Sequence, residues 1–262
     1  MSICKASALV LKSINLRESS RIVTLYSKEF GKMKVVAKGM LLPQSRFGGS
    51  LENFSEINIV FYKRENTELY ILSQVDLVNP FHKLCLDLDR FAIASTGMEL
   101  LDKLVSWEES SSKIFDLSLD FLSQIESTGK SNLKKILLGY VLKLVTILGY
   151  KPELEDCVAC DKKIKDRFIF FNPERGGLVC PSCLIDDGFY IKFTRDSIEK
   201  ASQLRRLSLK SAGKIKMSES QSDEVLCGIL DFLDFHVGRG KDLKSMEFFK
   251  SINSGGISES EG

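Results

Sequence analysis

The sequence predicts an α+β protein with an N-terminal β-barrel and a C-terminal helical bundle that carries an inserted metal module. Short apolar runs separated by polar turns fill residues 1–80, and the apolar period changes to that of helices after Pro80. Two Cys-x-x-Cys pairs then lie within residues 151–190. A chain of 262 residues is long enough for two domains, so we expect a barrel domain at 1–80 and a helical domain at 81–250.

The first domain has the pattern of a five-stranded barrel. In its fourth apolar run, Ile57, Ile59 and Phe61 occupy alternate positions, which is the period of a strand. Five short strands at this spacing predict a small closed barrel, of which the OB-fold is the best-known example of this length. The longest connection, 39–49, falls between the third and fourth strands, as that fold requires. The predicted strands are Ala8–Asn15, Arg21–Ser27, Lys32–Lys38, Ser55–Lys63 and Leu69–Val78.

Apolar stripes at helical spacing follow Pro80. The stripe from Leu133 to Leu148 is apolar almost all round, which marks the central helix of a bundle. Gly149 and Pro152 form a helix stop after it. Two further stripes precede it, over 84–105 and 114–125. Two more helices are expected after the cysteines, over 194–207 and 223–237. The last residues, 251–262, are rich in Gly, Ser and Glu and are expected to be disordered.

Four cysteines have the spacing of a structural zinc site. Cys157 and Cys160 form one Cys-x-x-Cys pair, and Cys180 and Cys183 form a second pair after 19 intervening residues. The intervening chain reads as a hairpin that returns the second pair to the first. Four thiolates leave no open coordination position, so we expect one structural Zn²⁺ and no metal catalysis. The alternatives are a redox dithiol or a site that has lost its metal.

The remaining cysteines and the catalytic motifs give weaker signals. Cys4, Cys85 and Cys227 lie in apolar patterns and are expected to be small buried hydrophobic residues. The sequence has two histidines and neither a G-x-S-x-G nor an H-E-x-x-H motif. The segment 129–131 resembles the end of a phosphate-binding loop, but Gln124 stands where that loop needs glycine. The composition and the missing motifs therefore argue against most enzymes.

The hydropathy pattern argues for a cytoplasmic protein. There is no run of 18 apolar residues, and the apolar run near the N-terminus is short and ends at Lys12. In that reducing compartment, the seven cysteines are more readily explained as metal ligands than as disulfides.

The charge is distributed unevenly. The net charge is +2, yet residues 1–46 hold nine basic and two acidic residues, and residues 192–216 hold eight basic and two acidic residues. Local basic excess favours a polyanion bound by one face, whereas the alternative is a solvated rim of lysines. Tyr26, Phe30 and Phe47 are candidates to stack on bases, or else are core aromatics. The candidate DNA-binding residues are Lys12, Arg17, Arg21, Lys32, Lys34, Lys38, Arg46, Arg205 and Arg206.

An ordered set of short segments resembles one family. The segments are Glu18–Ser27, Gly31-Lys32, Ala37-Lys38-Gly39, Ser45-Arg46, Glu99–Asp102, Leu148–Pro152 and Gly176–Cys183. Together they resemble the bacterial recombination and repair family RecO, over about residues 8 to 190 and more loosely to about 250.

The resemblance implies an OB-fold, a helical domain and, in many members, a zinc module. It also implies a DNA repair and recombination mediator that binds single- and double-stranded DNA and anneals complementary strands, with no enzymatic turnover. Its partners would be RecR and the single-stranded DNA-binding protein, with RecA loaded as the outcome. Some members lack the cysteines, so zinc is not essential to the fold in general.

Two other functions stay open on the sequence. The first is a zinc-ribbon interaction module in transcription or translation, with a barrel that contacts RNA or protein. It predicts little salt-dependent affinity for DNA. The second is an enzyme, either a thiol oxidoreductase or a nucleotide-using protein. It predicts reactive, metal-free cysteines or nucleotide binding.

Overall fold

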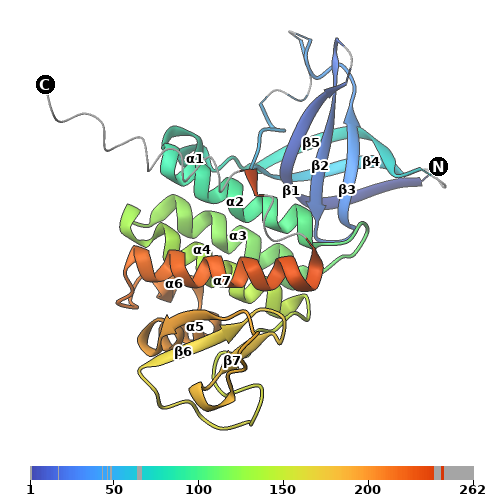
Figure 1. The fold of residues 1–262 in the computed structure, drawn as a ribbon. Coiled ribbons are helices and arrows are strands. Elements are labelled where there is room, and N and C mark those ends of the chain that lie inside the picture. The colour runs from blue at the N-terminus through green and yellow to red at the C-terminus, as the bar shows by residue number, and fades with distance from the viewer. Residues whose placement is uncertain are drawn as a thin grey trace, which may run out of the picture. The chain divides into compact units, whose positions relative to one another are not determined.

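The computed structural model describes residues 2–16, 18–42, 44–45, 47, 49–63, 67–238 and 243–244. Its backbone forms two compact units, residues 1–94 with 98–126 and residues 95–97 with 127–262 (Figure 1). The first unit thus includes the helices that follow the barrel. The domain boundary at residue 80 stays a prediction, and the predicted disordered tail at 251–262 lies outside the described residues.

The N-terminal strands close into the predicted barrel. β3 pairs with β5 in parallel, and the other pairs are antiparallel. The closed order β1-β2-β3-β5-β4 is the topology of an OB-fold, which confirms the predicted fold class. The strands are β1 (Ser2–Leu16), β2 (Ser20–Ser27), β3 (Gly31–Ala37), β4 (Glu56–Lys63) and β5 (Leu69–Asn79).

One long strand closes the barrel because it pairs on both edges. Ser2 to Leu9 of β1 pair with β4, and Ala8 to Leu16 pair with β2. The register shifts between Val10 and Lys12, and such a bulge bends a strand. Alternate residues of β3 point inward, so Met33, Val35 and Ala37 are buried in the barrel core while the residues between them face outward.

Helices follow the barrel, and the first apolar stripe is divided between two of them. Asp87 has an extended backbone, and its side chain accepts a hydrogen bond from Arg90 N. It therefore ends one helix and caps the next. The helices are α1 (His82–Leu86), α2 (Leu88–Leu104) and α3 (Ser112–Ser127).

The second unit is built around a buried helix, as its sequence predicts. α4 (Leu133–Ile147) is buried on nearly every side and packs against α5 (Arg195–Arg206), α6 (Leu209–Ala212) and α7 (Glu219–Val237). The predicted hairpin forms from β6 (Phe168–Asn172) and β7 (Gly177–Val179), and an unpredicted strand, β8 (Ile191–Thr194), pairs with β6. The two short 3₁₀ segments are η1 (Lys130–Asn132) and η2 (Pro181–Cys183).

Two minor predictions have clear outcomes. The segment 129–131 lies in the turn between α3 and α4, where η1 begins, and not after a strand. The prediction that the isolated cysteines are buried is wrong, because Cys85 and Cys227 are exposed and Cys4 is partly exposed. Within the described part of the chain, no helix combines the length and the apolar character needed to cross a membrane.

Candidate metal centre and nucleic-acid interface

The four predicted cysteines converge on one point. The sulfur atoms of Cys157, Cys160, Cys180 and Cys183 all lie within 4.8 Å of one another. The Sγ atoms of Cys160 and Cys180 are 3.9 Å apart, which is far beyond a disulfide bond and close to the edge of about 3.8 Å in a tetrahedral zinc–thiolate site. Cys157 and Cys180 are buried, and the other two are partly exposed. The donor set therefore fits a tetrahedral, soft metal ion.

Backbone contacts hold the first cysteine pair against the hairpin. Val158 N donates to the Leu178 carbonyl at 2.8 Å, and Leu178 N donates to the Glu153 carbonyl at 3.1 Å. Gly177 permits this approach, since a Cβ there would lie 2.5 Å from Val158 Cγ1 and 2.8 Å from Glu153 Cβ. Cys180 N also donates to Cys157 Sγ at 3.4 Å, which links the two pairs directly.

The thiols perturb one another strongly. Burial opposes ionisation of Cys157, yet peptide N–H groups of Cys180, Ala159 and Cys160 outweigh it and bring the pKa of Cys157 down to about 6. Hydrogen bonds with Cys180 and then Cys160 raise the pKa of Cys183 to about 12. Four sulfurs this close do not all ionise without a compensating charge, which a divalent cation would supply.

Lys32, one of the predicted DNA-binding residues, is committed to the protein interior. It is 6% exposed, and its ammonium lies 3.1 Å from Asp102 Oδ1 and also donates to the Asp102 backbone carbonyl. Lys12 donates to the same carboxylate at 2.5 Å but is largely exposed. The buried Lys32 ammonium is thus unavailable to phosphate, and we remove it from the DNA-binding set.

Three other predicted cations of the barrel remain on its surface. Lys38 is exposed, and Lys34 is partly exposed on the outward side of β3. Arg21 is partly exposed, and its guanidinium contacts Asn15 Oδ1 at 3.1 Å and Glu52 Oε1 at 3.6 Å. Two further candidates, Arg17 and Arg46, lie outside the described residues.

The predicted base-stacking aromatics are mostly in the core. Tyr26 and Phe47 are 0% and 1% exposed, which confirms for these two the alternative of core aromatics over base stacking. Phe30 is partly buried against Phe61. Sequence reasoning missed an exposed indole, Trp107, whose ring lies beside two lysines of β3. No local pattern marks it, because the segment that carries it reaches β3 from a distant part of the sequence.

The two adjacent arginines of α5 differ in environment. Arg205 is buried and donates to the Pro152 carbonyl at 2.7 Å and to Glu155 Oε1 at 2.9 Å. It therefore fixes the segment that leads into the first cysteine pair, and we remove it from the DNA-binding set. Arg206 contacts the same carboxylate at 2.6 Å but its side chain is 63% exposed. It remains available at the surface.

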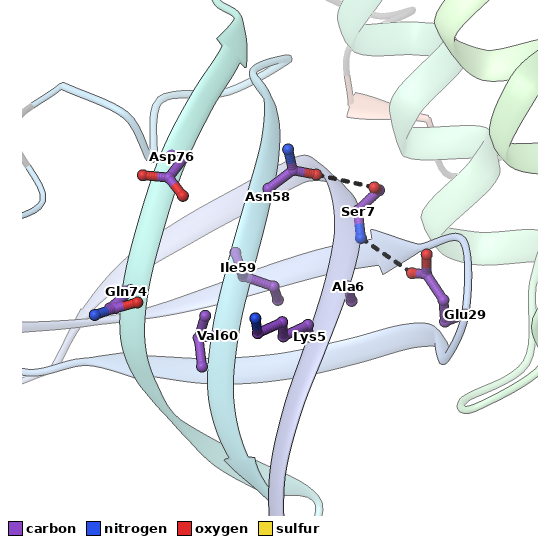
Figure 2. Close-up of a pocket in the computed structure, with 9 residues that line it drawn as sticks. All are labelled: Lys5, Ala6, Ser7, Glu29, Asn58, Ile59, Val60, Gln74 and Asp76. Atoms are coloured by element: carbon purple, nitrogen blue, oxygen red, sulfur yellow. Dashed lines mark hydrogen bonds between the residues drawn. The ribbon is translucent and has the colours of Figure 1, made fainter.

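A hollow of about 380 Å³, lined by both polar and apolar side chains, lies over β1, β4 and β5 of the barrel. Figure 2 shows Ser7 between Asn58 and Glu29, and its hydroxyl donates to Asn58 Oδ1 at 2.9 Å. Because an amide oxygen is a poor base, this contact does not activate the serine as a nucleophile. The hollow has one lysine, Lys5, against two carboxylates, Glu29 and Asp76, which disfavours a phosphate there.

Fold and site together define a class of protein in which an OB-fold is joined to a helical domain with a four-cysteine module that can hold a metal ion. The family model described as Recombination protein O N terminal matches residues 1–81, and Recombination protein O C terminal matches residues 85–247. The chain therefore belongs to the RecO family of DNA repair proteins.

Named relatives agree with this assignment along almost the whole chain. "DNA repair protein RecO" of Desulforamulus reducens is 31% identical over 252 residues, which cover 96% of each chain. The protein of the same name from Desulfatibacillum aliphaticivorans is 29% identical over 94% of this chain and 96% of its own. That of Caldanaerobacter subterraneus subsp. tengcongensis is 33% identical over 70% of this chain and 72% of its own.

Proposed function

We propose that this chain is a DNA-binding recombination mediator that acts without enzymatic turnover. It binds single- and double-stranded DNA, anneals complementary strands and helps to load RecA onto single strands coated with the single-stranded DNA-binding protein. RecR is its proposed partner, and the bacterial cytoplasm, at the nucleoid, is its proposed location. The observation that carries DNA binding is a pair of accessible lysines in an OB-fold, Lys34 on the outward side of β3 and Lys38 in the turn directly after that strand.

Annealing follows from charge screening. Two complementary strands repel through their phosphates, and a basic surface reduces this repulsion while the bases stay free to pair. The barrel supplies one such surface. The second basic stretch supplies exposed cations on the other unit, namely Lys192, Arg206, Lys210, Lys214 and Lys216. One chain thus offers two surfaces for two strands.

We further propose that the metal is one structural Zn²⁺ held by the four cysteines. Zinc prefers a tetrahedral thiolate site, and four protein ligands leave no position for substrate. The metal would stabilise the hairpin and its neighbouring segment. The cysteine site thereby contributes to the fold of the second unit and not to a chemical step.

A salt titration tests the DNA-binding surface. Each phosphate neutralised contributes about −0.7 to the log–log slope on single strands and about −0.9 on duplex. We expect Lys38→Ala to reduce the magnitude of this slope by roughly one such step, and Lys34→Ala combined with it to reduce the slope further. Lys5→Ala is the matched control, because Lys5, like Lys38, is exposed but lines the hollow of Figure 2, which has two carboxylates.

The outcome decides whether DNA binds at β3. If the slope falls for the β3 variants and not for Lys5→Ala, the outward side of β3 carries phosphate contacts. If the β3 variants bind DNA as the wild type does, DNA does not bind at β3. An absence of salt-dependent DNA binding in the intact chain contradicts the proposed function itself.

A further inference from the structure

The segment after α2 is fastened along β3 by its backbone. Trp107 forms a parallel bridge with Lys32, and Glu108 N donates to the Lys32 carbonyl at 3.0 Å. Gly31 permits the contact, because a Cβ on this residue would lie 2.3 Å from the Glu109 carbonyl oxygen. Tyr26 Oη donates to that same oxygen at 3.5 Å. The position of Trp107 is therefore fixed without help from its own ring.

The indole of Trp107 is nevertheless left partly in solvent. It is 46% exposed. The ammonium groups of Lys32 and Lys34 lie 4.4 Å and 4.6 Å from the ring centroid. Both lysines alternate along β3 with residues of the barrel core, so their side chains point away from that core. They therefore reach the indole from the strand side. A cation over one face of an indole is attractive, and the indole is held there at the cost of leaving apolar surface exposed.

The surroundings favour a nucleobase over an apolar partner. Lys34 lies on β3 and Lys38 lies in the turn directly after it, so both are positioned to meet a phosphate backbone beside the ring. The adjacent carboxylate of Glu108 is engaged, because Tyr70 Oη donates to it and Lys63 Nζ lies 3.8 Å away. A rigid aromatic face next to accessible cations is the arrangement by which proteins hold unpaired bases.

We propose that Trp107 is a stacking platform for one unpaired base of single-stranded nucleic acid bound at β3. This inference rests on the proposed function and adds to it a means of preferring single strands, because a base inside a duplex is already stacked on both faces. Stacking of this kind changes affinity by about tenfold per base. We expect Trp107→Ala to lose about that factor on single strands and less than about twofold on duplex of equal length.

Trp107 also provides its own readout, because it is the only tryptophan in the sequence. We would titrate the full chain with oligo-dT and, separately, with a duplex of equal length, following indole fluorescence. The anisotropy of a labelled oligonucleotide measures binding in parallel. Quenching on oligo-dT with little change on duplex is expected. Trp107→Phe should keep most of the single-strand affinity, and Phe189→Ala, which truncates another exposed aromatic, should bind as the wild type does.

Each other outcome has a definite meaning. Unchanged indole fluorescence while anisotropy reports binding, together with wild-type affinity in Trp107→Ala, overturns the stacking role and leaves the proposed function standing. Equal losses on single strands and duplex in a folded Trp107→Ala also overturn it, because stacking requires an unpaired base. If neither DNA binds the wild type, both the proposed function and the stacking role fall.

Discussion

Replacing Asp102 by Asn removes the charge that compensates a buried lysine. The Asp102 carboxylate lies between Lys32, whose side chain is 7% exposed, and Lys12, whose side chain is 56% exposed. Burial opposes ionisation of Asp102, but the hydrogen bonds and charges of the two lysines outweigh it and lower the pKa of this carboxyl. Asn keeps the size of the side chain and an acceptor oxygen, so the substitution isolates the charge.

The magnitude follows from the two environments. Removing one partner of a buried ion pair lowers the free energy of unfolding by about 3 to 5 kcal/mol, because the other charge is left buried without a partner. An exposed ion pair contributes under about 1 kcal/mol. Lys32 keeps backbone acceptors in the variant, at the Asp102 and Val105 carbonyls, which places the loss near the lower limit. We therefore expect Asp102→Asn to lower the free energy of unfolding by about 3 kcal/mol. Lys12→Ala should lower it by under about 1 kcal/mol.

Urea unfolding followed by the fluorescence of Trp107 measures this loss, since the single tryptophan lies in the same compact unit. A carboxyl with a lowered folded pKa stabilises the protein above its unfolded pKa, and this contribution disappears as pH falls through the folded value. The difference between wild type and Asp102→Asn should be complete at neutral pH and shrink below about pH 4. A loss no larger than that of Lys12→Ala, or one that persists in acid, refutes the reasoning.

Three further predictions concern the second unit and the proposed mechanism. Cys180→Ser should release the metal and lower the melting temperature. Native mass spectrometry should show one zinc per wild-type chain and none in the variant. A wild-type chain that is metal-free and fully stable contradicts the proposed zinc site. Arg205→Ala should destabilise the chain by about 3 kcal/mol and Arg206→Ala by under about 0.5 kcal/mol, which thermal unfolding can measure. Equal effects contradict the difference in environment between the buried Arg205 and the exposed Arg206. Annealing of complementary oligonucleotides should need no nucleotide triphosphate and should slow as salt rises, and a strict ATP requirement contradicts charge screening.

The sequence was most informative where local patterns determine structure. Alternation in strands such as Ile57–Phe61 depends only on which side chains face the core, so the barrel strands and their closure were predictable. Thr194 was predicted to start a helix, and its side chain accepts a hydrogen bond from Ser197 N. The four cysteines were predictable for a related reason, because metal-ligand geometry imposes a fixed spacing on the chain.

The roles of individual cations were not predictable, because they depend on partners that are distant in sequence. Lys32 and Lys34 look alike as residues of one strand, yet Lys32 is buried against Asp102, 70 residues further on. Arg205 and Arg206 are neighbours, but helical geometry turns only Arg205 toward Pro152. A count of positive charges includes all four and cannot tell which two are accessible.

The same distinction between buried and accessible cations bears on the DNA contact proposed for the barrel. Two buried cations, Lys32 and Arg205, hold segments of the chain in place, and the chain needs them whether or not DNA is present. Lys32 in particular positions the segment that carries Trp107, through its contact with the Val105 carbonyl and its place beside the ring. A variant that removes Lys32 would therefore weaken DNA binding by displacing the indole, even though its ammonium is not accessible to phosphate. Such a loss should be greater on single strands than on duplex, whereas loss of the accessible Lys38 should lower the salt dependence on both.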